Sequence, residues 1–166
     1  LPLKKLNLFV EGGSYRLGPD GVLYISEQVV GQNSIENIEK LKLDLIANLD
    51  LTLPLVVRTK EEIEEFLKIE FKVQDIVWFQ PPPKAVERTG HADMYFQFIK
   101  DSKKTVVVVE ANYNARPEFY STDFQSKVEQ ANLAFEKMAQ IFLKRGFRVI
   151  RQKVESTETI FYSPTN

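Results

Sequence analysis

The stretch DMYFQFIKDSKKTVVVVE, residues 93–110, decides the fold of this chain. It contains two runs rich in aromatic and β-branched residues, 93–99 and 105–110, which are separated by the polar turn KDSKK and therefore predict two strands. Apolar residues then recur at helical spacing over about 123–145, and the run FRVIRQ at 147–152 predicts one more strand. The order strand, strand, helix, strand predicts a ββαβ unit in a mixed α/β protein.

A looser version of the same pattern occupies the first half of the chain. The runs LNLFV at 6–10 and VLYIS at 22–26 predict strands, and the apolar spacing over 35–49 predicts a helix. A capping box, formed by Thr59 and Glu62, predicts the start of a second helix, and DIVWF at residues 75–79 predicts a strand. The four glutamates of that second helix fall in its first turns, where carboxylates are favourable, so we interpret them as structural.

Length and composition limit the classes of protein that the chain can represent. Its 166 residues suffice for one domain or for part of a larger one, and we expect divergent modules over about 1–74 and a clear ββαβ unit over 75–152. The 22 basic and 23 acidic residues nearly cancel, so the charge pattern predicts neither a nucleic-acid partner nor a membrane surface. The chain begins at Leu1 without a signal-like segment, which we interpret as a truncated start. The compartment stays undetermined, with the cytoplasm favoured.

The residues available for chemistry are few. The chain has no cysteine and one histidine, which excludes thiolate chemistry and a multi-histidine metal site within this sequence, and we expect no cofactor. That histidine, His91, lies two residues before Asp93. Because residues two apart in a strand face the same side, the two side chains could project together, one holding a cation and the other moving protons. A lone histidine at a strand entrance is more often structural, so spacing alone leaves both interpretations open.

Four motifs occur in order along the chain: FVEGGS, GVLYISEQ, EEIEEFLK followed by DIVWF, and TGHADMYFQFI. In this arrangement the chain resembles the agmatine deiminase and bacterial peptidylarginine deiminase family, which are guanidino-modifying enzymes of the pentein superfamily. The resemblance extends over about residues 6–110, and the least typical part is about 32–58. It implies an α/β propeller of ββαβ modules around a pseudo-fivefold axis, of which this chain would hold about three of five modules.

The resemblance also implies roles for individual residues. His91 would be the acid and base that protonates the leaving ammonia and then activates water, and Asp93 would hold the substrate guanidinium by paired hydrogen bonds. Glu11, Gly12 and Gly13 match the glycine motif, which we interpret mainly as turn structure near the substrate channel. In the family a cysteine thiolate attacks the guanidinium carbon, ammonia leaves, and water releases a ureido product.

The chain departs from the family pattern in two respects. It has no cysteine, and its one tryptophan, Trp78, lies in VWFQ instead of the W-x-R-D motif that carries the family's other guanidinium-binding aspartate. We therefore expect half an active site that is inactive alone, acting on agmatine, peptidyl-arginine or a related substrate once modules missing from this chain are supplied.

Two other functions stay open. One is a non-catalytic pentein-like module that binds a partner or an arginine-like cation. The other is a magnesium-dependent nuclease, because Asp93 and Glu110 are spaced like the D…E-x-K arrangement, although Asn112 replaces the lysine. Arg16 and Arg116 could clamp a carboxylate, but exposed arginines are common and neither is assigned a role.

Overall fold

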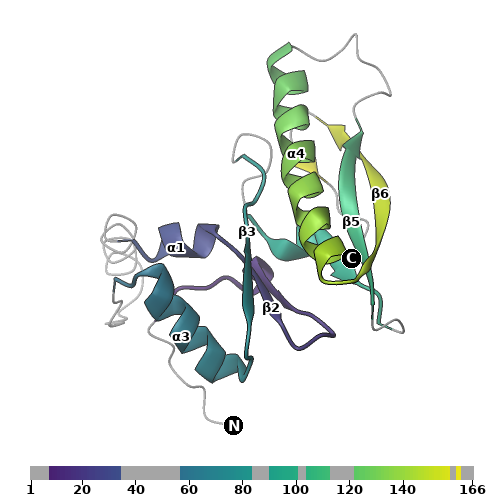
Figure 1. Ribbon diagram of the computed structural model, residues 1–166. Helices are drawn as coiled ribbons and strands as arrows, with labels where there is room; N and C mark the ends of the chain where they lie inside the picture. Colours follow the sequence, from purple (N-terminus) through teal and green to yellow (C-terminus); the bar gives the residue numbers. More distant parts are fainter. Residues whose placement is uncertain are drawn as a thin grey trace.

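The computed structural model describes residues 8–34, 57–83, 90–100, 104–112, 122–157 and 160–161. Within these residues the chain forms two sheets, each accompanied by a helix (Figure 1). The predicted helix over 35–49 lies outside the described residues. None of the helices in the described ranges is long and apolar enough to cross a membrane.

The first unit is a ββαβ arrangement that starts after a single turn of 3₁₀ helix, η1 (Gly12–Ser14). Its first two strands are antiparallel, and its third strand pairs in parallel with the second after the helical crossover. A short helix, α1 (Gln28–Gln32), follows the second strand. The elements of this unit are β1 (Tyr15–Leu17), β2 (Leu23–Ser26), α3 (Lys60–Phe71) and β3 (Ile76–Phe79).

The second unit repeats this topology, again after one turn of 3₁₀ helix, η2 (Ala92–Met94). Its first two strands are antiparallel, the strand after the long helix is parallel to the second, and a short strand closes the edge. The elements are β4 (Phe96–Phe98), β5 (Thr105–Asn112), α4 (Thr122–Lys144), β6 (Arg148–Thr157) and β7 (Ile160–Phe161). Figure 1 shows the resulting layers from left to right: α1 and α3, the first sheet, α4, and the second sheet.

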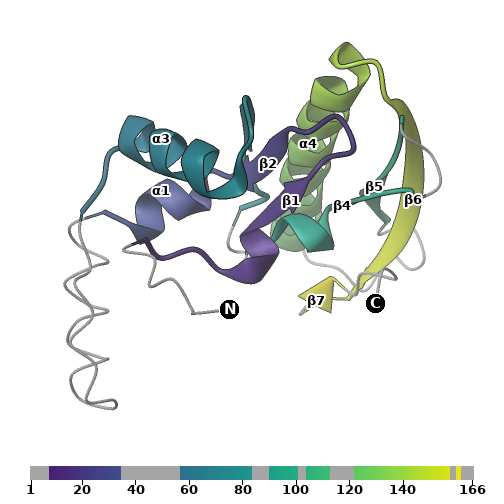
Figure 2. The same ribbon diagram turned by 90° about the horizontal axis from the view of Figure 1, so that it is seen from below.

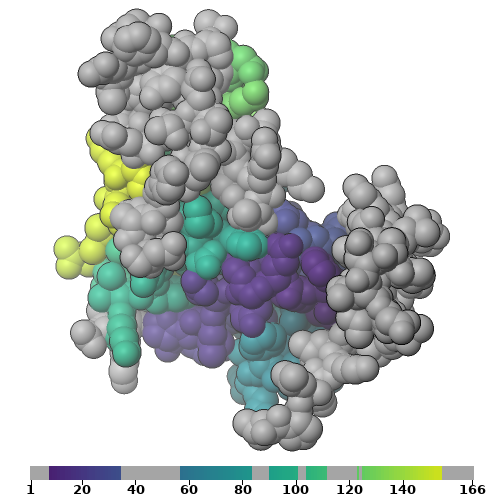
Figure 3. Space-filling model, turned by 180° about the vertical axis from the view of Figure 1, so that it is seen from behind, coloured from purple at the N-terminus to yellow at the C-terminus, as the bar shows by residue number. Residues whose placement is uncertain are grey.

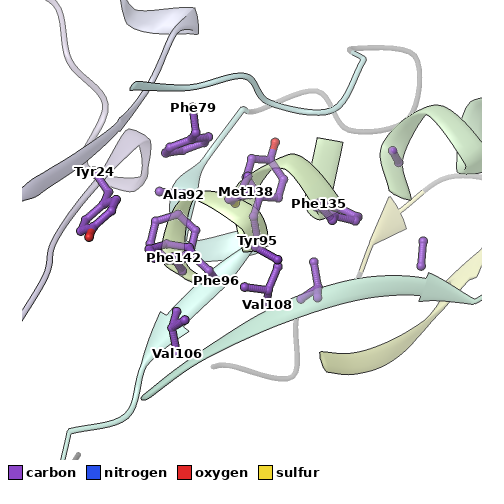
Figure 4. Packing of buried hydrophobic residues seen from close by; sticks show 14 of the residues in the cluster. Tyr24, Phe79, Ala92, Tyr95, Phe96, Val106, Val108, Phe135, Met138 and Phe142 are labelled. Atoms are coloured by element: carbon purple, nitrogen blue, oxygen red, sulfur yellow. The ribbon is translucent and has the colours of Figure 1, made fainter. Parts of the chain in front are cut away.

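Strand β2 belongs to both hydrophobic cores, because successive side chains of a strand point to opposite faces. Leu23 and Ile25 pack with Ile63 and Leu67 of α3 in one core. Tyr24 points the other way and enters the larger core of the second unit. Figure 4 shows Tyr24 beside the aromatic and aliphatic residues contributed by β3, η2, β4, β5 and α4. The two units therefore share apolar packing across their boundary.

The helices start and end where local chemistry dictates. Thr59 accepts a hydrogen bond from the backbone of Glu62, whose carboxylate accepts one from the backbone of Thr59, so the predicted capping box of α3 is confirmed. Helix α4 is followed by Gly146 at φ +79°, a backbone conformation that favours glycine. The apolar stripe of α4 is buried as predicted, with Val128, Ala131, Phe135, Met138 and Phe142 all in the core.

Arg145, which follows α4, ties the second unit to the first. Its guanidinium donates hydrogen bonds to Asp20 in the β1–β2 turn, at 3.2 Å, and to Asp75 before β3, at 3.0 Å. The guanidinium also lies over the ring of Tyr24. The hydroxyl of Tyr24 donates a hydrogen bond to the same Asp20 carboxylate, at 2.8 Å. Burial of the Arg145 guanidinium lowers its pKa, but the hydrogen bonds to Asp20 and Asp75 and the interaction with the Tyr24 hydroxyl group outweigh burial, so the pKa of Arg145 is raised.

Two predicted strands differ from the structure. The strand expected over 6–10 is wrong for residues 8–10, because the backbone of Phe9 pairs with the side chain of Asn33 and not with another strand. The first strand of the unit is instead Tyr15–Leu17, which lies between the two strands predicted at 6–10 and 22–26. The strand expected over 93–99 is shorter, because residues 92–94 form the turn η2. The mixed α/β class and the ββαβ order are confirmed, whereas the number of modules stays a prediction.

Candidate functional site

The two units begin in the same way, and the site lies where these beginnings meet. Glu11 precedes η1 with φ −72° and ψ 140°, and His91 precedes η2 with φ −79° and ψ 128°. Each residue is therefore the extended N-cap of its own 3₁₀ turn, Glu11 of η1 and His91 of η2. The two turns contact each other across the boundary between the units (Figure 2). Equivalent positions of a repeated unit thus bring a carboxylate and an imidazole together.

Asn33 fixes the path of the chain that leads to Glu11. This side chain is fully buried after α1, and its Oδ1 accepts a hydrogen bond from the backbone nitrogen of Phe9 at 2.9 Å. Its Nδ2 donates to the carbonyl oxygens of Phe9 and Val29, both at 2.8 Å. Buried backbone groups must be satisfied, so an amide that both donates and accepts can replace a strand partner at this place.

Gly90 and Ala92 fix the direction of His91 and Asp93. Gly90 has φ +68°, which is unfavourable for other residues, and it turns the chain just before His91. Ala92 is fully buried in the larger core, where Figure 4 shows it near Phe79. Because Ala92 points inward from a tight turn, the flanking side chains of His91 and Asp93 lie toward the boundary between the units.

Four side chains form what we call the carboxylate–histidine cluster: Glu11, Arg16, His91 and Asp93. The Nε2 atom of His91 lies 2.7 Å from Oε2 of Glu11, and Nδ1 lies 4.0 Å from Oδ1 of Asp93. A carboxylate only accepts hydrogen bonds, so Nε2–H is the donor to Glu11. In the neutral ring the basic atom is then Nδ1, which faces Asp93.

Gly13 lets the first turn approach this pair closely. A Cβ atom at Gly13 would lie 2.4 Å from Nδ1 of His91, a distance that real Cβ atoms essentially never show, and 3.0 Å from Oδ1 of Asp93, which is an unusually tight contact. In contrast, a Cβ atom at the adjacent Gly12 would meet nothing within 4 Å. The missing side chain at Gly13 therefore leaves room beside the two atoms that face each other in the cluster.

Asp93 already holds a guanidinium group. The Nη2 atom of Arg16, on β1, lies 3.3 Å from Oδ2 of Asp93. This ion pair lines a cavity of about 260 Å³ together with Leu17, Phe96, Gln97 and Phe98. The space-filling view shows the N-terminal segment, in purple, beside part of the second unit, in teal (Figure 3), and η1 and β1 contact η2 there.

The cluster combines two chemical capacities. Asp93 can hold a planar cation, as its ion pair with Arg16 shows, and a carboxylate can form charge-assisted hydrogen bonds with such a cation. His91 can exchange a proton through Nδ1 while Glu11 holds the ring at Nε2. The side chains of His91, Asp93 and Glu11 are 27%, 37% and 40% exposed, so a ligand can reach them.

The structure brings His91 and Asp93 together, with Nδ1 of His91 4.0 Å from Oδ1 of Asp93. They do not share one side of a strand, as the sequence suggested they could: His91 precedes the turn η2 and Asp93 lies within it. Glu110 of the nuclease hypothesis lines a different cavity, on β5 and α4, together with Glu129, Glu136 and Arg151. Within the described ranges, no group of three or more His, Cys, Asp or Glu residues is arranged to hold a metal ion. Arg116 lies outside the described residues.

Sequence reasoning missed two members of the cluster, Glu11 and Arg16. Glu11 was interpreted mainly as part of a glycine turn, and Arg16 was assigned no role. The signal that could have found Glu11 is its position: it precedes the turn of the first unit as His91 precedes the turn of the second. No comparable signal marks Arg16.

The fold is similar to that of solved agmatine deiminases. An agmatine deiminase from C. jejuni matches with a TM-score of 0.55 and 20% identity, covering 98% of this chain and 37% of that chain. A C315S form of that enzyme with substrate bound has the same TM-score and identity. The agmatine deiminase of Enterococcus faecalis matches with a TM-score of 0.50 and 20% identity, covering 90% of this chain and 33% of that chain.

These matches confirm the resemblance at the level of the fold. The chain spans a little over a third of the length of the C. jejuni enzyme. No protein-family model matches the sequence, and no curated protein matches it.

Proposed function

We propose that this chain supplies part of the active site of a deiminase-type hydrolase, which acts on a guanidino group and releases ammonia and a ureido product. One observation carries the proposal: His91 stands between two carboxylates, Glu11 and Asp93, and the second of these is paired with a guanidinium. The similarity in fold to agmatine deiminases supports the same reading. Agmatine and peptidyl-arginine are the substrate classes that we propose.

The roles follow from the geometry of the cluster. Asp93 binds the substrate guanidinium through paired charge-assisted hydrogen bonds. It does so at the place where its Oδ2 now pairs with Nη2 of Arg16. Nδ1 of His91 lies on the side of Asp93. The doubly protonated ring donates its Nδ1 proton to the departing ammonia, and the neutral ring that remains accepts a proton at Nδ1 from the water that attacks the same carbon. Glu11 orients the ring through Nε2 and balances its charge when both nitrogens are protonated.

The described residues form two ββαβ units, which we propose to be adjacent blades of a five-module fan. The chain contains no cysteine, so the thiolate that attacks the guanidinium carbon in this family must be supplied by another part of the assembled enzyme. We therefore propose that the chain carries half of an active site. A module that binds guanidinium without chemistry is the alternative, and it shares the role of Asp93.

Calorimetric titration tests this proposal directly. Agmatine and 1,4-diaminobutane share a butyl chain and a terminal amine, but only agmatine has a guanidino group. We expect the chain to bind agmatine more tightly than 1,4-diaminobutane, and Asp93→Asn to weaken agmatine binding at least tenfold, roughly 1.4 kcal/mol. Asp123→Asn is the matched control, because it removes the same charge from the exposed start of α4.

The outcomes separate the interpretations. If both ligands bind equally, or if the two variants behave alike, Asp93 is not a guanidinium anchor. If agmatine binds as expected, an activity measurement on the chain together with the part that supplies the cysteine distinguishes the hydrolase from the non-catalytic module. Ureido product that disappears in His91→Asn supports the hydrolase, whereas binding without product supports the non-catalytic module.

A further inference from the structure

We propose that Arg16 is an internal competitor for the guanidino substrate. In the substrate-free protein its guanidinium occupies Asp93, and it must leave before the substrate binds there. This inference rests on the proposed function, because it takes Asp93 as the guanidinium anchor. It adds that a residue of the chain itself sets the affinity of the anchor for its ligand.

The chemistry of the contact supports this role. Arg16 presents to Asp93 the same planar cation that the substrate would present, with Nη2 at 3.3 Å from Oδ2. The pair lines the cavity of about 260 Å³ beside the cluster, so the position held by Arg16 is open to a small ligand. Arg16 comes from β1 of the first unit and Asp93 from η2 of the second, so the contact spans the boundary between the units.

The ion pair is suited to being displaced. The side chains of Arg16 and Asp93 are 41% and 37% exposed, and pairs at this exposure are weak because water solvates both charges. Arg16 lies on β1, which is an edge strand of its sheet, so its long side chain can turn into solvent without disturbing the core. Arg16 therefore neutralises Asp93 when no ligand is bound, and a ligand that makes more contacts displaces it.

A ligand can bind only to molecules in which Arg16 has left Asp93. The apparent affinity of the ligand is therefore its intrinsic affinity multiplied by the fraction of molecules in that state. For an exposed ion pair the expected factor is small. Removing the guanidinium of Arg16 should strengthen binding of a simple guanidinium about two- to fivefold, as expected for a pair worth roughly 0.4–1 kcal/mol. A residue that helps to hold the ligand would have the opposite effect.

The test is a titration of the full chain with methylguanidinium chloride at constant ionic strength, followed by NMR of the backbone amides of His91 and Asp93. Methylammonium chloride is the control ligand, because it carries the same charge without the planar fork. We expect Arg16→Gln to bind methylguanidinium about two- to fivefold more tightly than the unaltered chain, roughly 0.4–1 kcal/mol. Arg148→Gln, which removes the same charge from the exposed start of β6, should leave the affinity unchanged.

Two results would overturn the inference, and they are distinguishable. If Arg16→Gln binds methylguanidinium equally or more weakly while Asp93→Asn abolishes binding, Arg16 is not a competitor but the anchor stands. If Asp93→Asn binds as well as the unaltered chain, the anchor itself is wrong and the proposed function fails with it. A thermal unfolding midpoint for each variant verifies that the folded chain is being compared.

Discussion

The Nε2 atom of His91 lies 2.7 Å from Oε2 of Glu11, although 80 positions separate the two residues. Each residue is the N-cap of the 3₁₀ turn that opens its ββαβ unit, so the contact joins equivalent points of a repeated structure. The cluster is therefore a product of how the two units pack. Changes at the boundary between the units are expected to disturb the cluster even where they touch none of its side chains.

Gly13→Ala tests the close approach of the first turn to the cluster. The new methyl group would overlap Nδ1 and Cγ of His91, so the ring or the turn has to move. We expect a loss of about 1–3 kcal/mol in the free energy of unfolding, as for other overpacked sites. Denaturant titration measures the loss.

Gly12→Ala is the matched control for that experiment, because a methyl group there would meet nothing within 4 Å. Its effect on the free energy of unfolding should stay within about 0.5 kcal/mol. Equal losses in the two variants would show that the turn itself, and not the room beside His91, requires glycine.

Asn33→Ala tests how the chain is led to Glu11. The substitution removes three hydrogen bonds and leaves the backbone groups of Phe9 without the side-chain partner that replaces a strand. We expect a loss of about 2–4 kcal/mol in the free energy of unfolding. Hydrogen exchange gives a local measurement: the amide of Phe9 should be protected in the unaltered chain and should exchange much faster in the variant. An unchanged exchange rate would contradict the assigned role of Asn33.

How far the sequence predicts this fold depends on where the information lies. Helix α3 was predicted because its capping box is local, and helix α4 because its apolar stripe repeats over many turns. The strand expected over 6–10 was wrong because alternating apolar residues cannot reveal that Asn33 satisfies the backbone of Phe9. The site was partly predicted for the same reason. The spacing of His91 and Asp93 is local, whereas their contacts with Glu11 and Arg16 depend on the packing of two units.

Arg145→Gln tests the link between the two units. The variant loses the ion pairs with Asp20 and Asp75. Because the arginine side chain is 30% exposed, we expect a loss of about 0.5–1.5 kcal/mol, and the loss should shrink in 1 M salt, where charges are screened beyond about 3 Å. Lys144→Gln removes the neighbouring positive charge and should change the unfolding free energy by less than about 0.5 kcal/mol. A salt-independent loss would mean that packing against Tyr24, and not charge, makes the link.

Tyr24 gives the chain a defined response to alkaline pH. Burial of the ring, together with the hydrogen bond to Asp20, raises the pKa of its hydroxyl above the ordinary value of 10.0. The folded state thus binds this proton more tightly than the unfolded state. The resulting stabilisation is complete below about pH 10 and is lost as the pH rises further, by up to about 1.4 kcal/mol per pH unit.

Tyr24→Phe removes this titration. The free energies of unfolding of the two proteins, measured between about pH 8 and pH 11, should therefore run parallel at the lower end and converge or cross at the upper end, where the unaltered chain falls more steeply. Curves that stay parallel throughout would show that the hydroxyl of Tyr24 ionises alike in the folded and unfolded states.

The ring of His91 offers the most direct test of the cluster, because it is the one histidine of the chain and its NMR signals need no further assignment. Agmatine should shift these signals saturably, 1,4-diaminobutane should shift them much less, and Asp93→Asn should abolish the response to agmatine. A ring that does not respond to agmatine, or that responds equally to both ligands, would contradict a guanidino-binding site built from Glu11, His91 and Asp93.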